Sequence, residues 1–491
     1  MKSEDISKAM NGLEEETIND AANKRKQSKK SRKPLWITIT AAAACLAVAG
    51  GVIAMNFGKD SPLAVSAAAE AIVAAKYPEM PKFPDEADYN NDWDAFDKAW
   101  TEWSQFRREP RNNIRNSADT LTDYYKKSVK EYLTSIEGNG VFSPLSLYMA
   151  LCMLAETTDG NSRAQILELM NADSIESLRT QAQNVWQVSY CADGATTSLL
   201  ANSIWLSDSI EYNRPTLENI AQYHYASSFS GQMGSAEYNK LLQDWLNENT
   251  GGLLTEQANN IEMSPETVLA LASTMYFKAR WFNEFNKELT KQDIFHAPEG
   301  DVTADYMRIT LDQAVYGGDN YMMTQLRFAN SEGSMWLVLP DEGYTPDDLL
   351  ADCEFIDWLD TDRRNQALDN KEAVFTEVRF SLPKFDALSD IDLMDGLANM
   401  GITDVMGENA DFSPLMEDSS GITLDSAKQA TRVKIDEEGC EAASFTVMME
   451  EGAALIENQP IDFTLDRPFI FVITNPCDQP TFVGVINNPA Q

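Results

Sequence analysis

An uncharged stretch from Leu35 to Phe57 divides this chain into two very unequal parts. As a helix it would extend about 34 Å, enough to cross a bilayer hydrocarbon core of about 30 Å. A basic cluster from Lys24 to Lys33 precedes it, and the positive-inside rule keeps such a cluster in the cytoplasm. The pattern therefore predicts a signal anchor that leaves the longer part of the chain outside the cell.

A cleavable signal peptide is the alternative, and it would release that longer part as a secreted protein. The apolar core of a signal peptide is usually about 7–15 residues long, so the anchor is favoured. A lipoprotein signal at Cys45 is disfavoured because Ala42 stands where leucine is expected. The predicted parts are a cytoplasmic basic tail (1–34), a transmembrane anchor (35–57), an extracytoplasmic stalk (58–116) and a folded domain (117–491). A single-pass protein of the cell membrane with few external cysteines is typical of a Gram-positive bacterial surface.

Composition excludes several classes of function. Asp and Glu number 77 against 39 Lys and Arg, and the formal charge is −38, so the surface that would neutralise nucleic-acid phosphates is missing. The only histidines are His224 and His296, so a His-rich metal site is ruled out. If the chain had a Ser/His/Asp triad, one of these two histidines would have to be its base. The sequence contains no nucleotide-binding, zinc-protease or nucleophile-elbow motif. We expect no cofactor and no metal.

The segment 58–116 combines prolines, acidic residues and aromatic side chains. Pro78, Pro81 and Pro84 prevent a continuous helix through its middle, which indicates a stalk. The aromatic residues argue that part of the segment packs on the following domain, and a carbohydrate-binding platform is the alternative. They are Tyr77, Trp93, Trp100 and Trp103.

From Ser117 onward, helical and strand-like stretches alternate without a repeat or a linker, which indicates one domain. Ser143-Pro144 has the residue types of a helix N-cap and first helical position. Buried strands are predicted at Val268–Phe277, Leu337–Leu339, Val378–Leu382 and Phe469–Ile473. This mixed order predicts an α+β fold with substantial sheet.

A run from Gly439 to Met449 lies between two acidic clusters near the C-terminus. It has no proline and one charge, so it is competent to form a strand. Its alternate residues are small, as one face of a strand inserted over a crowded core requires. They are Cys440, Ala442, Ser444 and Thr446. By pattern alone, an ordinary core strand is equally compatible.

Four separated parts of the sequence resemble the serpin family of serine protease inhibitors. They are Asn139–Ser146, Thr274–Trp281, Ile435–Ala443, and Arg467–Phe471 together with Phe482–Pro489. These parts follow the family's order and spacing across residues 117–491. The resemblance implies a serpin fold with a large central mixed or antiparallel sheet, additional sheets, about nine helices and an exposed reactive-centre loop near the C-terminus.

The resemblance also implies roles for individual residues. The hinge of the reactive loop comprises Glu438, Gly439, Cys440, Glu441, Ala442, Ala443 and Ser444. The shutter and breach, where the large sheet opens, comprise Asn139, Ser143, Ser146, Gln429 and Trp281. Gln429 stands where many members have histidine, and Ser273 where the family usually has asparagine. The hydrogen bonding of the shutter is therefore expected to differ from the family pattern.

The implied function is to trap a protease, so the chain is not expected to be an enzyme. A serine protease attacks the loop as a substrate, and insertion of the cut loop into the sheet then holds the protease as an acyl-enzyme. The family's spacing places the scissile bond at Ala453–Ala454. The loop is longer than in many members, and the alternative positions are Met449, Gly452 and Leu455.

The loop sequence also predicts specificity. Alanine suits the shallow pocket of an elastase-like protease, and no Lys or Arg occurs from Ile435 to Asp466, which disfavours trypsin-like proteases. Two alternatives stay open: a noninhibitory binding module with a serpin fold, and a membrane-spanning signalling protein that uses its cytoplasmic tail. We expect the inhibitor to be a monomer.

The hinge yields the first testable prediction. Ser444→Arg should convert the inhibitor into a substrate, because an unpartnered cation would have to enter the inner face of the sheet. Ala443→Glu, on the opposite face, should obstruct insertion less severely. Gel electrophoresis in SDS should show cleaved chain and no covalent band for Ser444→Arg. Retained stoichiometric trapping would contradict insertion of the loop.

Overall fold

The structure is a computed structural model, and it describes residues 71–78, 81, 84, 86–89, 92–116, 119–192, 196–329, 332–370, 373–424, 426–440 and 459–491. The predicted tail and transmembrane stretch lie outside these residues, as do Glu441, Ala442, Ala443, Ser444 and the reactive bond Ala453–Ala454. Among the residues that are described, no helix combines the length and apolar character needed to cross a bilayer.

Helices occupy much of the first half of the described chain and recur between later strands. The helices are η1 (Glu86–Tyr89), α3 (Trp93–Asn116), α4 (Asp119–Leu133), α5 (Pro144–Thr157), α6 (Gly160–Leu169), α7 (Ile175–Ser189), α8 (Arg214–Tyr223), α9 (Ala236–Asn249), α10 (Thr255–Asn259), η2 (Lys287–Leu289), α11 (Pro346–Leu350), η4 (Glu354–Leu359), α12 (Thr361–Asn370), α13 (Met394–Asn399) and η5 (Asp404–Met406). The predicted start of α5 is confirmed, because the Ser143 hydroxyl accepts a hydrogen bond from the Ser146 amide and Pro144 occupies the first turn.

Sixteen labelled strands complete the described elements. They are β1 (Gly140–Phe142), β2 (Cys191–Ala192), β3 (Thr196–Ser207), β4 (Ala226–Gly231), β5 (Leu269–Arg280), β6 (Lys291–Ala297), β7 (Gly300–Gly317), β8 (Tyr321–Arg327), β9 (Ser334–Pro340), β10 (Val374–Pro383), β11 (Phe385–Asp392), β12 (Lys428–Ile435), β13 (Gly439–Cys440), β14 (Ile461–Thr464), β15 (Phe469–Thr474) and β16 (Pro480–Ile486). The four predicted buried strands correspond to β5, β9, β10 and β15.

The strands form three sheets. A nine-stranded sheet has the order β1-β16-β15-β9-β8-β7-β10-β14, with β6 beside β7. A five-stranded sheet has the order β13-β5-β3-β2, with β4 beside β3, and β11 pairs with β12. Most pairs are antiparallel, whereas β3–β4 and β10–β14 are parallel. The predicted α+β class with a large mixed sheet is confirmed.

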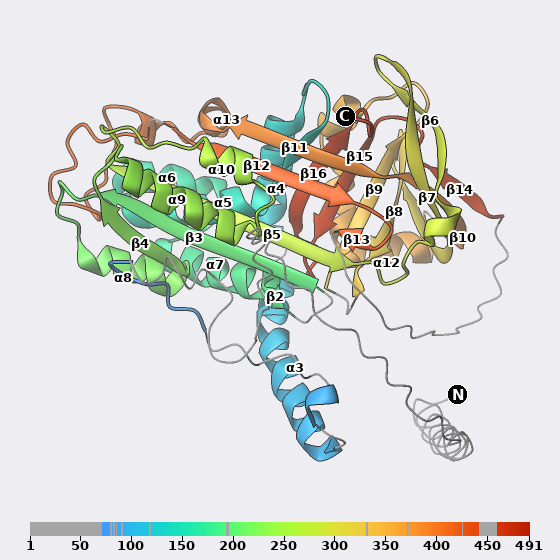
Figure 1. Cartoon of the computed structure of the whole chain (residues 1–491), viewed down its shortest axis with the longest axis horizontal. Helices are drawn as coiled ribbons and strands as arrows, with labels where there is room; N and C mark the ends of the chain where they lie inside the picture. Colours follow the sequence, from blue (N-terminus) through green and yellow to red (C-terminus); the bar gives the residue numbers. More distant parts are fainter. Residues whose placement is uncertain are drawn as a thin grey trace, which may run out of the picture. The chain divides into compact units, whose positions relative to one another are not determined.

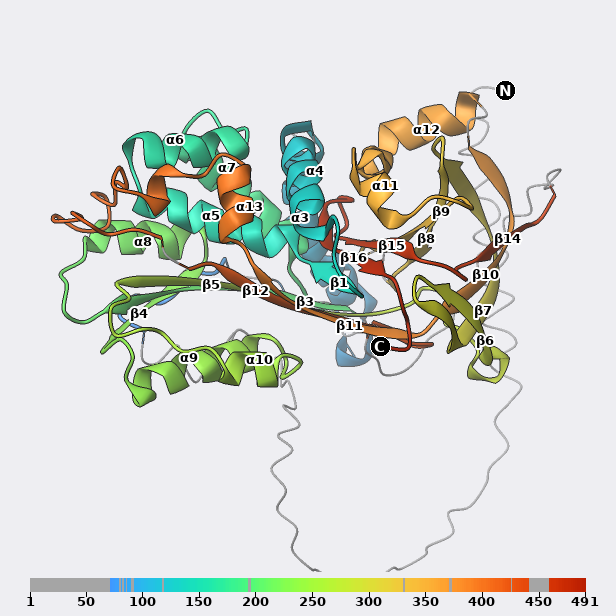
Figure 2. The ribbon, with the colours of Figure 1, turned by 90° about the horizontal axis from the view of Figure 1, so that it is seen from above.

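Helices cover both faces of the five-stranded sheet. Figure 2 shows α9 and α10 on one face, and α5, α6 and α7 on the other. On the α9 side, Trp205 of β3 stacks on Phe229 of β4 with ring centroids 4.3 Å apart, and it also contacts Tyr238 and Trp245 of α9. Trp205 is fully buried, so this aromatic packing anchors α9 over the sheet.

The segment expected to form a stalk packs in part on α7, on the other face of the sheet. Its helix α3 continues without a break to Asn116 and packs against α7 (Figure 1). Before α3 in the same segment, the ring of Tyr77 lies 5.4 Å from Trp186 and 6.0 Å from Tyr225, centroid to centroid. Part of the segment therefore packs on the following domain, whereas Trp93 and Trp100 on α3 are exposed.

Candidate functional site

The shutter is built around a buried glutamine. Gln429 of β12 accepts a hydrogen bond from the Ser143 amide at 2.7 Å and donates one to the Ser143 carbonyl at 2.9 Å. The Ser143 hydroxyl lies 3.1 Å from the Ser146 hydroxyl and donates to the carbonyl of Thr481 in β16 at 2.8 Å. A primary amide has both the donor and the acceptor that this pairing needs. The structure thus brings Ser143, Ser146 and Gln429 together and links β12 to the start of α5.

Asn139, close to this cluster, bonds to the chain that follows β16. Its side-chain amide donates to the Asn488 carbonyl at 2.7 Å, and its oxygen accepts from the amides of Asn487 and Asn488 at 2.9 Å each. Nearby in β1, Val141 donates its amide to the Ser389 hydroxyl of β11 at 2.8 Å. These bonds fasten β1 to the end of β16 and to β11.

Ser273 differs from the family residue and leaves polar atoms unsatisfied. It lies opposite Asn202 in the β3–β5 pair. In the described structure, the hydroxyl of Ser273 and the side-chain oxygen of Asn202 are buried without a hydrogen-bond partner. Asn202 uses its amide nitrogen instead, which donates to the His224 carbonyl at 2.9 Å. This side of the shutter is therefore less strongly bonded than the Gln429 side.

The breach lies at the end of β5, where Trp281 holds the chain that leads to the hinge. The indole nitrogen of Trp281 donates to the Asp436 carbonyl at 2.9 Å, and its amide donates to the Glu438 carbonyl at 3.2 Å. Its ring stacks on Phe328 with centroids 5.2 Å apart. Trp281 is buried, so its position fixes the backbone of the hinge.

The buried carboxylate of Glu437, which the sequence did not single out, anchors the turn that leads into the hinge. Glu437 accepts a hydrogen bond from the Thr290 hydroxyl at 2.8 Å and pairs with the Lys384 ammonium at 3.0 Å. Burial raises the pKa of Glu437, but hydrogen bonds from its own backbone, Lys384 and Thr290 lower it more, so the carboxyl has a pKa below its usual value. The acidic cluster 436–438 was the signal in the sequence, but its partners lie far away along the chain.

The chain reverses direction over the turn at Glu437 and Glu438, just before Gly439. Asp436 and Gly439 exchange backbone hydrogen bonds at 3.0 and 3.3 Å, and β13 then pairs antiparallel with β5 (Figure 1). The register sets Gly439 opposite Arg280 and Cys440 opposite Ala279. Gly439 has φ +144°, and a Cβ there would lie 2.1 Å from the Ala279 carbonyl oxygen, so only glycine fits.

The strands on either side of the hinge belong to different sheets. Among the described residues, β5 pairs with β3 and β13, whereas β12 pairs with β11 along its length. No strand pairing recorded for this part of the chain joins β5 to β12. The start of the hinge therefore enters the sheet at the position where a further strand would follow β5.

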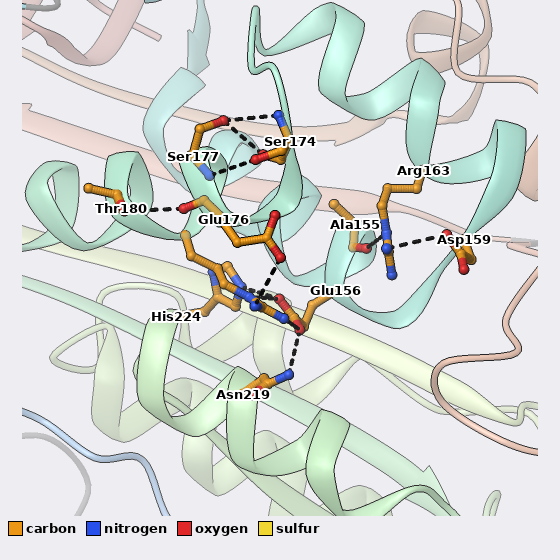
Figure 3. Close-up of polar contacts among 11 residues, drawn as sticks. Ala155, Glu156, Asp159, Arg163, Ser174, Glu176, Ser177, Thr180, Asn219 and His224 are labelled. Carbon is orange, nitrogen blue, oxygen red and sulfur yellow. Dashed lines mark hydrogen bonds and ion pairs between the residues drawn. The ribbon is translucent and has the colours of Figure 1, made fainter.

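The two histidines occupy different surroundings, and neither forms a Ser/His/Asp triad with the residues that the structure describes. Figure 3 shows His224 and Asn219 beside Glu156, with His224 Nε2 3.4 Å from the carboxylate and Asn219 bonded to it. Arg179 donates to the same carboxylate. His296 is exposed, and its pair with Asp301 raises its pKa. In the described residues, the imidazole of each histidine contacts a carboxylate and no serine hydroxyl. The same residues contain no cluster of metal-ligand side chains.

Glu156 is ionised within this buried cluster. Burial raises the pKa of its carboxyl, but interactions with His224 and Arg179 lower it more, to about 2 from an ordinary 4.5. Arg179 contacts both carboxylate oxygens, through Nε at 2.9 Å and through a shorter bond from Nη2. The cluster joins the end of α5 to α7 and α8 beneath the five-stranded sheet.

The turn at Gly439 gives a second prediction. Gly439→Ala should break the β13–β5 pairing, because a strained φ costs about 1–3 kcal/mol and the added methyl group overlaps the Ala279 carbonyl. Hydrogen exchange at the amides of Trp281 and Phe285, which bond to this turn, should become faster. Gly407→Ala is the control, since no atom lies within 4 Å of the place its methyl group would take and its φ is not positive. Unchanged protection in Gly439→Ala would contradict the pairing.

Glu156 gives a third prediction. Its lowered pKa stabilises the fold above about pH 4.5, and this stabilisation is lost as the pH falls towards about 2. Glu156→Gln should therefore lower the free-energy barrier to unfolding near neutral pH by on the order of 3 kcal/mol, so that the variant unfolds faster than the parent. This difference between variant and parent should shrink in acid. Unfolding rates in urea at several pH values measure it. Glu176→Gln, which removes an exposed partner 3.8 Å from the same arginine, should change little. A pH-independent difference would contradict this role.

Comparisons with known proteins agree with this geometry. The family model described as Serpin (serine protease inhibitor) matches residues 115–489. Serpin-Z1C of Triticum aestivum is 26% identical over 377 residues, covering 72% of this chain and 91% of the wheat protein. The leukocyte elastase inhibitor of Sus scrofa is 26% identical over 360 residues, covering 72% of this chain and 93% of its own length.

Solved structures give the same result. The native state of tengpin, a thermophilic serpin, matches with a TM-score of 0.65 and 25% identity, covering 75% of this chain and 93% of tengpin. Its latent state matches with a TM-score of 0.62, 24% identity, and coverage of 75% and 96%. The chain belongs to the serpin family of serine protease inhibitors and is not an enzyme.

Proposed function

We propose that this serpin is a membrane-anchored suicide inhibitor of extracellular serine proteases with elastase-like specificity. The observation that carries the proposal is β13, the start of the hinge, paired antiparallel with β5 at the position where an inserted strand would begin. A cut loop that continued along β5 would gain a ladder of backbone hydrogen bonds, and this gain would drive insertion.

The register of β13 supports insertion of the loop with the small side chains of its alternate residues facing the core. Continued along β5, it would set Ala442 opposite Phe277 and Ser444 opposite Met275. Directly opposed residues share a face of the sheet, and both Ala279 and Phe277 are buried. The small side chains would therefore enter the crowded face, which is the arrangement that insertion requires.

The loop composition and one relative support the elastase-like specificity. Ala453 would fill a shallow pocket, whereas a trypsin-like pocket needs a cation that the stretch from Ile435 to Asp466 lacks. The porcine relative that is 26% identical to this chain bears the name leukocyte elastase inhibitor. Both considerations favour a protease that cuts after small residues.

The anchor would set the place of action. Residues 35–57 would hold the chain in the cell membrane as a single pass, with the serpin domain outside and the basic tail inside. An inhibitor held in this way protects the surface to which it is attached, because its local concentration there exceeds that of a secreted form.

The reactive bond gives the fourth prediction. The parent chain should form an SDS-resistant covalent band with an elastase, and Ala453→Arg should abolish this band and create one with a trypsin-like protease. Gly452→Arg is the matched control. It should neither cleanly abolish the band with elastase nor cleanly create a band with a trypsin-like protease. Mass spectrometry of the released C-terminal fragment should find that it starts at Ala454.

Other outcomes are equally informative. A fragment starting at Leu455 or Glu450 would move the reactive bond, and a start outside Glu450 to Ile456 would overturn the elastase assignment. Cleavage of the parent chain without any covalent band would support the noninhibitory binding module.

A further inference from the structure

The N-terminal half of α3 extends beyond the packed part of the molecule. None of the residues 93–106 is buried, whereas Arg107 and Ile114 in the second half are only 6% and 3% exposed. Figure 1 shows the start of α3 projecting away from the sheets. This half also precedes the residues that match the family model. Its side chains are therefore accessible from solvent and lie outside the part that relatives share.

Four aromatic side chains of this half form a continuous column along one face of the helix. They are Trp93, Phe96, Trp100 and Trp103. The ring centroid of Phe96 lies 6.0 Å from that of Trp93 and 6.2 Å from that of Trp100. The rings of Trp100 and Trp103 lie 5.4 Å apart, and Trp93 and Trp100 are 52% and 43% exposed. Because neighbouring rings hold this aromatic column in place, binding a partner would cost little entropy in ordering it.

A carboxylate lies between the two exposed tryptophans. Asp97 is four residues after Trp93 and three before Trp100, so the three side chains share one face of the helix. Among the residues that the structure describes, no hydrogen bond or ion pair involves the Asp97 carboxylate. Lys98 lies on another side of the helix and pairs with Glu102, 3.8 Å away. Asp97 therefore presents an uncompensated negative charge beside the aromatic column.

Another part of the same chain shows what such a combination binds. The guanidinium of Arg363 lies over the ring of Trp358, 4.5 Å from its centroid. The same guanidinium pairs with Glu354, four residues before the tryptophan, at 3.2 Å, and with Asp357 at 3.4 Å. Arginine suits both contacts because its planar group stacks on an aromatic face while its N–H groups bond to a carboxylate. On α3, the carboxylate and the tryptophan that follows it have a comparable spacing, three residues instead of four.

Charge selects the kind of partner that this surface can bind. Residues 92–106 carry more acidic than basic side chains, and the whole chain has a formal charge of −38. The acidic residues are Asp92, Asp94, Asp97 and Glu102, and the basic one is Lys98. A phosphate-rich polymer or an anionic lipid surface would be repelled by this helix, whereas a basic polypeptide would be attracted.

We infer that the first half of α3 is a docking surface for a basic, arginine-containing segment of another protein. An arginine of this partner stacks on Trp93 or Trp100 and directs its N–H groups to Asp97. The docking is separate from loop insertion, so it goes beyond the proposed inhibition. It would bring a basic partner to the chain whether or not that partner is a protease.

The first test compares two carboxylates on the same helix. A short synthetic peptide of alternating arginine and glycine is titrated into the full-length chain, and the dissociation constant is measured by calorimetry. Asp97→Asn should weaken binding about fivefold, because it removes the carboxylate beside the tryptophans. Glu102→Gln removes an equal charge from another side of the helix and should bind like the parent. Equal affinities for the two variants, or no binding by the parent, would overturn the docking surface.

The second test asks whether an aromatic face is needed. Trp100→Leu keeps an apolar side chain but loses the ring, so it should weaken binding of the arginine peptide about threefold, whereas Trp100→Phe should stay closer to the parent. A peptide of alternating lysine and glycine should bind more weakly than the arginine peptide, because lysine cannot stack and bond in the same way. Equal affinities of the parent and Trp100→Leu would contradict the stacking.

Two other partners are tested in the same assay. A neutral oligosaccharide of N-acetylglucosamine that binds the parent and Asp97→Asn equally, but not Trp100→Leu, would identify a carbohydrate platform. Vesicles of an anionic phospholipid that bind the parent through Trp100 would identify a membrane surface. Either result would overturn the assignment of a basic polypeptide, and neither depends on whether the chain traps a protease.

Discussion

Backbone hydrogen bonding along β5 governs how the other parts of this molecule are arranged. One side of β5 pairs with β3 over nearly its full length, and on the other side the described pairing is limited to Ala279 and Arg280 with β13. Strand edges need partners for their amides and carbonyls, so the chain that supplies them gains stability. The start of the hinge at Gly439 and the anchored turn at Glu437 lie at the end of this edge.

Two buried carboxylates define which elements pack together. Glu156 holds α5, α7 and α8 in contact through Arg179 and Asn219, and Glu332 holds α3 and the approach to β9 together through two arginines. A buried charge is costly unless each partner is present, so alternative packings that separate these groups are disfavoured. The charges thus contribute to the choice of one arrangement more than to overall stability.

The sequence was sufficient for features that depend on neighbouring residues. The cap at Ser143, the half-buried strand β5, the buried strand β15 and the overall α+β class all follow from local pattern. Contacts between distant residues were not accessible in this way. Lys384 as the partner of Glu437 and the docking of Tyr77 depend on sheet register and topology, which periodicity does not encode. The replacement at Gln429 predicted altered bonding, but only the structure shows that both atoms of the amide bond to Ser143.

The glutamine at the shutter also removes a source of pH sensitivity. Histidine, which many serpins carry at this position, changes its charge between about pH 5 and 8, whereas an amide does not titrate. The polar groups that meet at the Gln429 contact are the Ser143 backbone, the hydroxyls of Ser143, Ser146 and Thr431, and the Thr481 carbonyl, and none of them ionises in this range. The closure between β12 and α5 therefore keeps the same hydrogen bonds in mildly acidic and in neutral surroundings. The shutter would therefore keep a constant strength across that range of acidity.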